Sequence, residues 1–204
     1  ARAIDKPRSY FFSWPEKVLP DSDIAQFQQL LTRRIQGEPI AHILGEQEFW
    51  SNTFKVTADT LIPRPDTEVL VEQALAQLPR EKLCTIADLG TGSGCIAISI
   101  ALERPHWNVT AVDFSAAALA VAKSNADRLA AGNVQCIESS WCESLEDNHF
   151  DLIVSNPPYI REQDEHLELG DVRFEPRSAL TAGEDGLEDI RIISQQAKAK
   201  LKSG

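Results

Sequence analysis

The sequence predicts an α/β protein with a doubly wound, mostly parallel sheet and a small N-terminal lobe of helix and β-hairpin. Two observations predict this fold class. From residue 84 onward, short apolar segments of strand type alternate with longer segments of helical periodicity, which is the order of a parallel sheet with right-handed crossovers. A glycine-rich segment directly follows the first of those strands, where such a sheet turns into its first helix.

The N-terminal lobe is expected to contain an amphipathic helix over residues 21–35. Its apolar residues recur at the spacing of one helical face, and Gly37 stands where a helix commonly ends. The residues of that face are Ile24, Phe27, Leu30, Leu31 and Ile35.

A β-hairpin is expected to follow over residues 45–63. Aromatic and β-branched residues are enriched there, and the polar pair Ser51-Asn52 interrupts them at the expected turn. Pro63-Arg64-Pro65 then prevents regular structure. We therefore expect residues 1–65 to form the N-terminal lobe and residues 66–204 to form the second domain.

The second domain is expected to open with a helix that begins at Asp66, a suitable N-cap, and stops at Pro79. Four strands and two further helices follow in alternation. Mostly apolar strands of this kind are buried on both faces of a parallel sheet. The expected strands are 84–87, 109–112, 134–137 and 150–154, and the expected helices are 96–102 and 116–129.

Composition narrows the partner and the compartment. Thirty-one acidic against twenty basic residues give a formal net charge of −11, which disfavours unaided binding to a nucleic-acid backbone. No apolar stretch is long enough to span a membrane, and the first residues lack the apolar core of a signal peptide, so we expect a cytoplasmic protein. The four cysteines form no C-x-x-C pair and have no histidine at ligand spacing, so no metal site is expected.

The first segment that carries chemistry is Asp88-Leu89-Gly90-Thr91-Gly92-Ser93-Gly94. Its alternating glycines allow a tight turn and a close approach of a ligand to the backbone, beside the electropositive start of a helix. The spacing G-x-G-x-G differs from the dinucleotide fingerprint G-x-G-x-x-G, which counts against NAD. Asp88 would repel a phosphate but can accept hydrogen bonds from a ligand ammonium group. The alternative is a glycine-rich turn with no ligand.

A second acidic residue, Asp113, follows the second expected strand, about twenty residues beyond the glycine segment. A doubly wound fold places a carboxylate at this point to accept hydrogen bonds from the hydroxyl groups of a ribose. An aspartate at a strand end can equally cap a helix. The glycine segment that precedes Asp113 favours the ribose role.

Together these residues resemble the cofactor site of the class I S-adenosylmethionine methyltransferases, which have a Rossmann-like sheet. The resemblance implies S-adenosyl-L-methionine as cofactor, with its methionine moiety at the glycine segment and its ribose at Asp113. In that family the loop after the third strand flanks the adenine, which makes Trp141 the candidate to pack on the base. The implied cofactor-binding residues are Asp88, Leu89, Gly90, Thr91, Gly92, Asp113, Trp141 and Asn156.

The third segment, Asn156-Pro157-Pro158-Tyr159, follows the fourth expected strand, at the edge where such sheets bind ligands. An amide nitrogen is a poor nucleophile because its lone pair is delocalised into the carbonyl. The side-chain oxygen of Asn156 and the backbone carbonyl of Pro157 can each accept one N–H of a target NH2 group and orient its lone pair toward a methyl donor. Pro158 stiffens the loop, and Tyr159 offers a face for stacking. We expect catalysis at Asn156, Pro157 and Tyr159, and substrate contacts from all four residues.

This tetrad resembles that of amino methyltransferases acting on adenine, cytosine or glutamine, so it leaves the substrate open. Further segments resemble the release-factor glutamine N5-methyltransferases of the HemK type, and the resemblance extends over residues 28–204. These segments are Gly37–Gly45, Glu48–Trp50, Leu61–Glu68, Gly170–Pro176 and Ala179–Leu187.

The resemblance implies methyl transfer to the side-chain amide nitrogen (N5) of the glutamine in the Gly-Gly-Gln loop of peptide-chain release factors. Release factors would be the protein substrate, with no stable nucleic-acid partner and no membrane contact; the oligomeric state is left open. The family has a longer N-terminal helical domain and continues into further strands beyond Gly204. We therefore expect both ends of the protein to be incomplete, with the sheet truncated after its fourth strand.

Two other functions compete with this one. The first is N6-adenine methylation of a nucleic acid, which the absence of a basic patch interleaved with aromatic residues disfavours. The second is a non-catalytic cofactor-binding module, which the intact tetrad at Asn156 disfavours.

Overall fold

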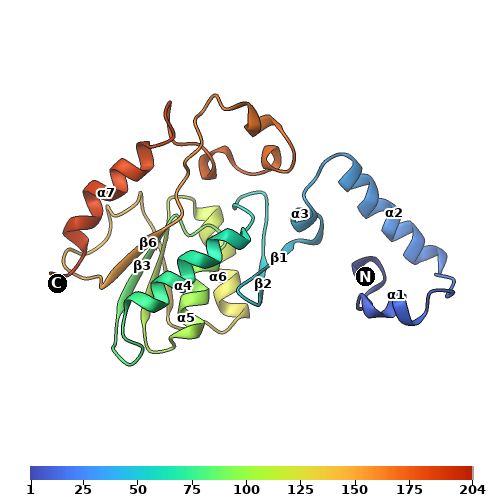
Figure 1. The fold of residues 1–204 in the computed structure, drawn as a ribbon, viewed down its shortest axis with the longest axis horizontal. Helices are drawn as coiled ribbons and strands as arrows, with labels where there is room; N and C mark the ends of the chain where they lie inside the picture. Colours follow the sequence, from blue (N-terminus) through green and yellow to red (C-terminus); the bar gives the residue numbers. More distant parts are fainter. Residues whose placement is uncertain (204) are drawn as a thin grey trace.

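The computed structural model describes residues 1–203 and contains a large parallel sheet and a small antiparallel one (Figure 1). The large sheet has the strand order β5-β4-β3-β6. Its chain enters in the middle, runs to one edge and then crosses back to the other side, which confirms the predicted doubly wound sheet. The strands are β3 (Thr85–Leu89), β4 (Asn108–Asp113), β5 (Val134–Glu138) and β6 (Leu152–Ser155).

Helices cover both faces of this sheet. One face packs against α4, α5 and α6, whereas α7 lies on the opposite face together with the loop that precedes β6 (Figure 1). Neighbouring residues of β3 show the division, because Ile86 belongs to the first core and Ala87 to the second. The bounds are α4 (Glu68–Gln77), α5 (Cys95–Glu103), α6 (Ala116–Arg128) and α7 (Glu188–Lys200).

The edge strand β6 begins two residues later than predicted. Phe150 forms only an isolated parallel bridge with Leu201, and Asp151 separates that bridge from the strand. The carboxylate of Asp151 accepts a hydrogen bond at 2.8 Å from the backbone N–H of Thr85, the first residue of β3. The backbone N–H of Asp151 also donates to the carbonyl of Thr85 at 2.8 Å, so Asp151 is joined to the start of β3 by both backbone and side chain.

The start of α4 corrects one prediction. Asp66 is not its N-cap: residues Pro65–Thr67 form a 3₁₀ turn, η2, and α4 begins only at Glu68. The proline explains the difference, because its fixed φ and missing N–H suit a first turn and move the helix start along the chain. The predicted stop before Pro79 is confirmed, since α4 ends at Gln77.

The small sheet is the predicted hairpin, made of β1 (Glu46–Phe49) and β2 (Asn52–Lys55). Phe49 pairs with Asn52, so the turn is Trp50-Ser51, one residue earlier than predicted. Both turn residues have positive φ, 48° and 58°, which is the geometry of a two-residue turn that matches strand twist. The side-chain N–H of Asn52 donates to the carbonyl of Trp50 at 2.9 Å and stabilises this turn.

The remaining described elements are short, apart from the predicted helix α2 (Asp21–Ile35), whose bounds are confirmed. They were not predicted, because most are single turns without a repeating apolar pattern. They are α1 (Ser9–Ser13), α3 (Ile40–Leu44), and the 3₁₀ turns η1 (Arg2–Ile4), η3 (Glu165–Glu168), η4 (Val172–Phe174) and η5 (Arg177–Ala179).

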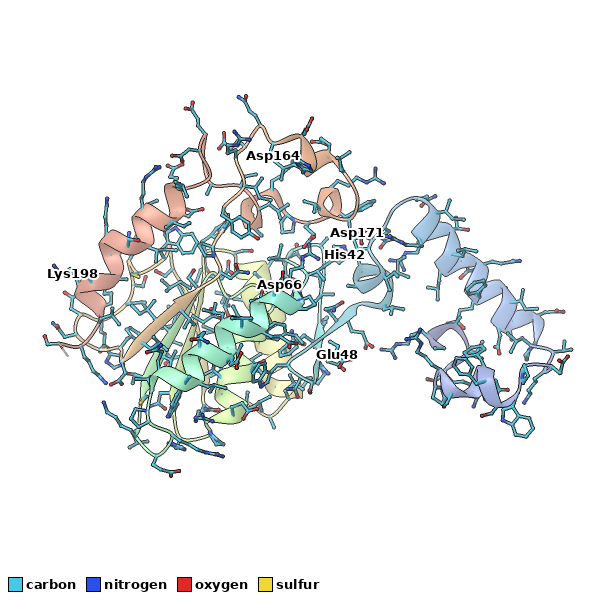
Figure 2. All side chains as sticks on the ribbon, viewed as in Figure 1. His42, Glu48, Asp66, Asp164, Asp171 and Lys198 are labelled. Atoms are coloured by element: carbon cyan, nitrogen blue, oxygen red, sulfur yellow. The ribbon has the colours of Figure 1, made fainter. Side chains whose placement is uncertain are left out.

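Helix α2 lies to one side of the sheet domain (Figure 1), and its C-terminal end forms an ion pair with the loop before η4. The guanidinium of Arg34 pairs with Asp171 at 2.7 Å, and Figure 2 shows Asp171 on the side of the loop that faces α2. Arg173 donates to the backbone carbonyl of Gln36 at 3.3 Å. Charged and polar contacts thus connect the end of α2 to this loop.

The hairpin is attached through a buried asparagine of α6. The side chain of Asn125 accepts from the N–H of Lys55 at 2.8 Å and donates to the carbonyls of Lys55 and Ser93, at 3.0 and 2.9 Å. Phe49 and Phe54 of the hairpin belong to the same core as the sheet. The division of the chain near Pro65 stays a prediction.

Replacing Asn125 by alanine should lower the free energy of unfolding by about 2–4 kcal/mol, because buried backbone groups of the hairpin and of the turn before α5 lose their partner. Urea denaturation measures the change. Lys123→Ala, an exposed position on the same helix, is the control and should leave stability nearly unchanged. A loss at Asn125 as small as that of the control would contradict the anchoring role.

Candidate functional site

The glycine segment forms a tight turn at the exit of β3. Its glycines at 90, 92 and 94 have positive φ values of 71°, 54° and 80°, which side chains disfavour. The turn is tied to β4, because Thr91 N–H donates to the carbonyl of Val112 at 2.8 Å and Gly92 N–H donates to a side-chain oxygen of Asp113 at 2.9 Å. A Cβ at Gly94 would lie 2.8 Å from Ile98, so close packing also requires glycine there.

Asp88 lies beneath this turn. Its side chain is fully buried, and one oxygen accepts hydrogen bonds from the hydroxyl of Thr91 at 2.7 Å and the N–H of Ala97 at 3.2 Å. The other oxygen is buried without a partner in the described chain, and burial raises the pKa of this carboxyl to about 6. Asp88 therefore braces the turn and the start of α5 from inside the fold.

Asp113 stands at the carboxyl end of β4, as predicted, with 7% of its surface exposed. One oxygen accepts from Gly92 N–H and the other from Ser115 N–H, each at 2.9 Å. Burial raises the pKa of this carboxyl, although these donors oppose the shift. Each oxygen retains acceptor capacity toward a hydroxyl group on its open side.

Trp141 follows β5 in a left-handed conformation, with φ at 48°. Its ring packs beside the glycine turn, so that a Cβ at Gly90 would lie 3.3 Å from the ring carbon Cζ3. The ring is also packed against the core formed with α7. It is therefore a fixed apolar surface next to Asp113.

Two adjoining cavities open at this edge of the sheet. The first is lined by the glycine turn, the end of β4 with Phe114, and Trp141. The second is lined by the start of α4, the segment from Ser155 to Ile160, and Val172. Six residues line both, and we call them the shared wall: Leu61, Arg64, Thr67, Asn156, Pro158 and Ala179.

The tetrad that follows β6 lies between these cavities. Pro158 is buried and Tyr159 is 65% exposed, while Asn156 and Pro157 are half-buried. The neighbouring hydroxyl of Ser155 donates to the carbonyl of Leu89 at 2.8 Å, which fixes the end of β6 to the end of β3. Within residues 1–203 the side chain of Asn156 makes one hydrogen bond, from Nδ2 to the hydroxyl oxygen of Thr67 at 3.5 Å.

The chain after η5 supports the tetrad from behind. The N–H of Ile160 donates to the carbonyl of Leu180 at 2.9 Å, and Ala182 N–H donates back to Ile160 at 3.0 Å. Gly186 approaches so closely that a Cβ there would lie 2.5 Å from the carbonyl oxygen of Tyr159. These contacts hold the loop in one conformation.

A buried carboxylate that sequence reasoning missed fixes one side of the shared wall. Glu175, 5% exposed, accepts from the backbone N–H of Ile62 at 2.8 Å and pairs with the guanidinium of Arg64. It joins two segments more than a hundred residues apart, at separations of 113 and 111 positions. The only sequence signal was its place between an aromatic residue and a proline.

The structure brings most of the predicted site residues to one edge of the sheet. Asp88 and Leu89 are the exceptions: both are buried and neither lines either cavity. The contact expected between Asp88 and a ligand ammonium group therefore stays a prediction, and its buried oxygen, which has no partner within residues 1–203, is the atom that this contact would use. The residues that line at least one cavity are Gly90, Thr91, Gly92, Asp113, Trp141, Asn156, Pro157, Pro158 and Tyr159.

Two further properties concern residues 1–203. They contain no group of three histidine, cysteine, aspartate or glutamate side chains placed to hold a metal ion. None of their helices is both long and apolar enough to cross a membrane.

Family models match two parts of the chain. Residues 65–181 match the methyltransferase small domain, and residues 1–45 match the PrmC N-terminal domain. The first match contains the glycine turn, Asp113 and the tetrad. Fold and site thus define a methyltransferase.

Curated relatives identify the family within this class. The release factor glutamine methyltransferase of Shewanella oneidensis is 52% identical over 98% of this chain and 69% of its own length. That of Escherichia coli is 51% identical over 97% of this chain and 71% of its own length. The chain belongs to the release factor glutamine methyltransferase family.

A solved structure agrees on the fold. The hMettl16 catalytic domain, in complex with MAT2A 3′UTR hairpin 1, aligns with a TM-score of 0.58 over 86% of this chain and 61% of that one. Its sequence is 14% identical, so the likeness concerns the arrangement of the sheet and helices alone.

The protein uses S-adenosylmethionine, and the first cavity suits it. Glycine backbone forms one side, where a Cβ at Gly92 would meet nothing within 4 Å. The carboxylate oxygens of Asp113 can accept hydrogen bonds from ligand hydroxyl groups, and Trp141 provides an aromatic surface. The ribose role of Asp113 and the adenine role of Trp141 stay predictions.

Asp113→Ala should weaken S-adenosylmethionine binding by about 1.5–3 kcal/mol, because hydrogen bonds to a charged acceptor are lost. Titration calorimetry measures the affinity. Asp127→Ala, which removes an exposed carboxylate from α6, should leave it unchanged. Equal affinities for the Asp113 variant and the parent protein would exclude the ribose role.

The raised pKa of Asp88 predicts a pH effect on stability. The folded-state pKa of Asp88, about 6, lies above the ordinary value of 3.8. Between these pH values the folded protein therefore binds more protons than the unfolded chain. The stability that protonated Asp88 contributes is lost as the pH rises through this window. Asp88→Asn removes the titration. The free energy of unfolding of the variant, relative to the parent, should therefore increase from pH 4 to pH 7 by about 1–3 kcal/mol. A constant difference would contradict the assignment.

Proposed function

We propose that this protein methylates the side-chain amide nitrogen (N5) of a glutamine in a peptide-chain release factor, with Asn156 as its main catalytic residue. The observation that carries the assignment is the position of Asn156 in the shared wall, where it faces both cavities. Family membership supports the substrate, since the curated relatives are release factor glutamine methyltransferases. A residue that lines both cavities can contact the target amide next to the methyl donor.

The first cavity is proposed to hold S-adenosylmethionine, which supplies a methyl group on an electrophilic sulfonium. The backbone of Gly90, Thr91 and Gly92 lies against the methionine moiety, and Asp113 accepts from the ribose hydroxyls. Trp141 packs on the adenine. Asp88 and Leu89 fix the turn from beneath.

The second cavity is proposed to hold the glutamine side chain. Asn156 Oδ1 and the carbonyl of Pro157 accept the two N–H bonds of the target amide, which withdraws its nitrogen from conjugation and points the lone pair at the first cavity. The exposed ring of Tyr159 covers the planar amide. Pro158 is buried, and its fixed φ limits movement of the loop.

The flanking parts are proposed to serve the protein substrate. Arg34 at the end of α2 pairs with Asp171, and the next residue, Val172, lines the second cavity, so α2 adjoins the loop that borders this cavity. The net charge of −11 supports a protein substrate over a nucleic acid. A release factor is a translation protein, which supports the cytoplasm as the compartment.

Asn156→Ala should lower kcat for release-factor methylation on the order of a hundredfold or more, because the acceptor acts mainly when the amide lone pair is localised. The affinity for S-adenosylmethionine should stay nearly unchanged. Asn156→Asp keeps an acceptor and should retain part of the activity. Methylated peptide is quantified by mass spectrometry with isotope-labelled cofactor, and turnover near the parental value in the alanine variant would refute the mechanism.

The substrate is tested in the same assay. A release factor and adenine-containing oligonucleotides are offered in parallel at low salt, the condition that most favours nucleic-acid binding. We expect the label on the glutamine of the Gly-Gly-Gln loop. A release factor with that glutamine replaced by alanine is the matched control. Labelled adenine with unlabelled glutamine would replace the assignment by the adenine alternative.

A further inference from the structure

We propose that Thr67 is a positioning residue that holds the amide of Asn156 in its productive orientation. The inference rests on the proposed function of Asn156 and adds a residue to it. Thr67 lies in the shared wall, and its hydroxyl oxygen is 3.5 Å from Asn156 Nδ2. A hydrogen bond at this distance is long, so its value lies in orientation more than in strength.

The helix end at which Thr67 stands gives a second, independent observation. Thr67 ends the turn η2 and directly precedes α4, and its backbone is already helical, with φ −69° and ψ −17°, so its hydroxyl makes no capping hydrogen bond to the helix backbone. That hydroxyl is directed to Asn156 instead. The hydroxyl is thus not used as a helix cap and is available to the amide of Asn156.

The chain around Thr67 is held in place on both sides. Its own N–H donates to the carbonyl of Arg64 at 3.0 Å, and Arg64 is in turn paired with the buried Glu175. On the other side, the carboxylate of Glu68 accepts from the N–H of Trp50 at 2.8 Å. The hydroxyl is therefore carried by a backbone that is fixed before substrate binds.

The asymmetry of a carboxamide explains why this contact matters. One edge of Asn156 carries an acceptor and the other carries two donors. A target NH2 group needs the acceptor, so the productive orientation turns Nδ2 away from it and into the shared wall. Thr67 supplies the acceptor for Nδ2 in that orientation. Without the hydroxyl, this orientation leaves an N–H group of the half-buried amide without its protein partner and is less favoured.

Thr67→Val keeps the shape of the side chain and removes the hydroxyl. We expect kcat for release-factor methylation to fall about tenfold, with the affinity for S-adenosylmethionine within about twofold of the parent. Thr67→Ser, which retains the hydroxyl, should recover most of the lost turnover. Thr53→Val, the same change at an exposed position of β2, should have no effect.

A double-mutant cycle separates positioning from a structural role. The Asn156→Ala variant has no amide to orient. Adding Thr67→Val to it should therefore not lower the rate constant of methyl transfer further, as measured under single-turnover conditions. A further loss equal to that in the parent background would overturn the proposal. So would unchanged kcat in Thr67→Val, or a parallel loss of cofactor affinity. If Asn156→Ala itself kept its turnover, the proposed function would fail first, and the two failures are thereby distinguished.

Discussion

The hydrogen bond between Gly92 N–H and Asp113, together with that between Thr91 N–H and Val112, is the constraint on which the site depends. It fixes the turn after β3 to the end of β4, and the second oxygen of Asp113 fixes the start of α6. The hydroxyl of Ser155 donates to the carbonyl of Leu89 and so joins the end of β6 to the end of β3. Three neighbouring strand ends are thus locked at one height, and the loops that leave them have little freedom. Preorganisation of this kind is what lets a few side chains act on a reacting group.

The features that sequence predicted are those determined locally. Apolar periodicity located the four strands of the sheet, and the order of glycines located the turn. Contacts between distant segments were not predictable: Thr67 meets Asn156 across 89 positions, and Glu175 reaches Ile62 across 113. Neither residue stands in a pattern that reveals its partner. The predicted start of α4 was wrong for a different reason. Pro65 favours a 3₁₀ turn, so Asp66 lies inside that turn and does not cap the helix.

Asp88 and the hairpin illustrate how burial changes a sequence interpretation. Asp88 belongs to the central strand β3, where it pairs with Ala111 on one side and Val154 on the other. Its side chain is therefore covered by the helices that pack on the sheet and is fully buried. A carboxylate beside a glycine segment therefore need not face the ligand. Likewise, the hairpin precedes the expected boundary at Pro65, yet Phe49 and Phe54 complete the core beneath α5 and α6. The change in sequence composition near Pro65 therefore does not mark an end of the hydrophobic core.

The shared wall also has a consequence for inhibition. Because the two cavities adjoin and share six lining residues, Asn156 and Pro158 among them, a single compound can carry one group for each cavity. Such a bisubstrate compound would join a nucleoside to a glutamine-like amide by a linker of a few atoms. A short linker raises the effective concentration of the second group at its cavity, so its affinity would exceed that of either half. Selectivity over other methyltransferases would come from the amide half, since the nucleoside half meets features common to the class.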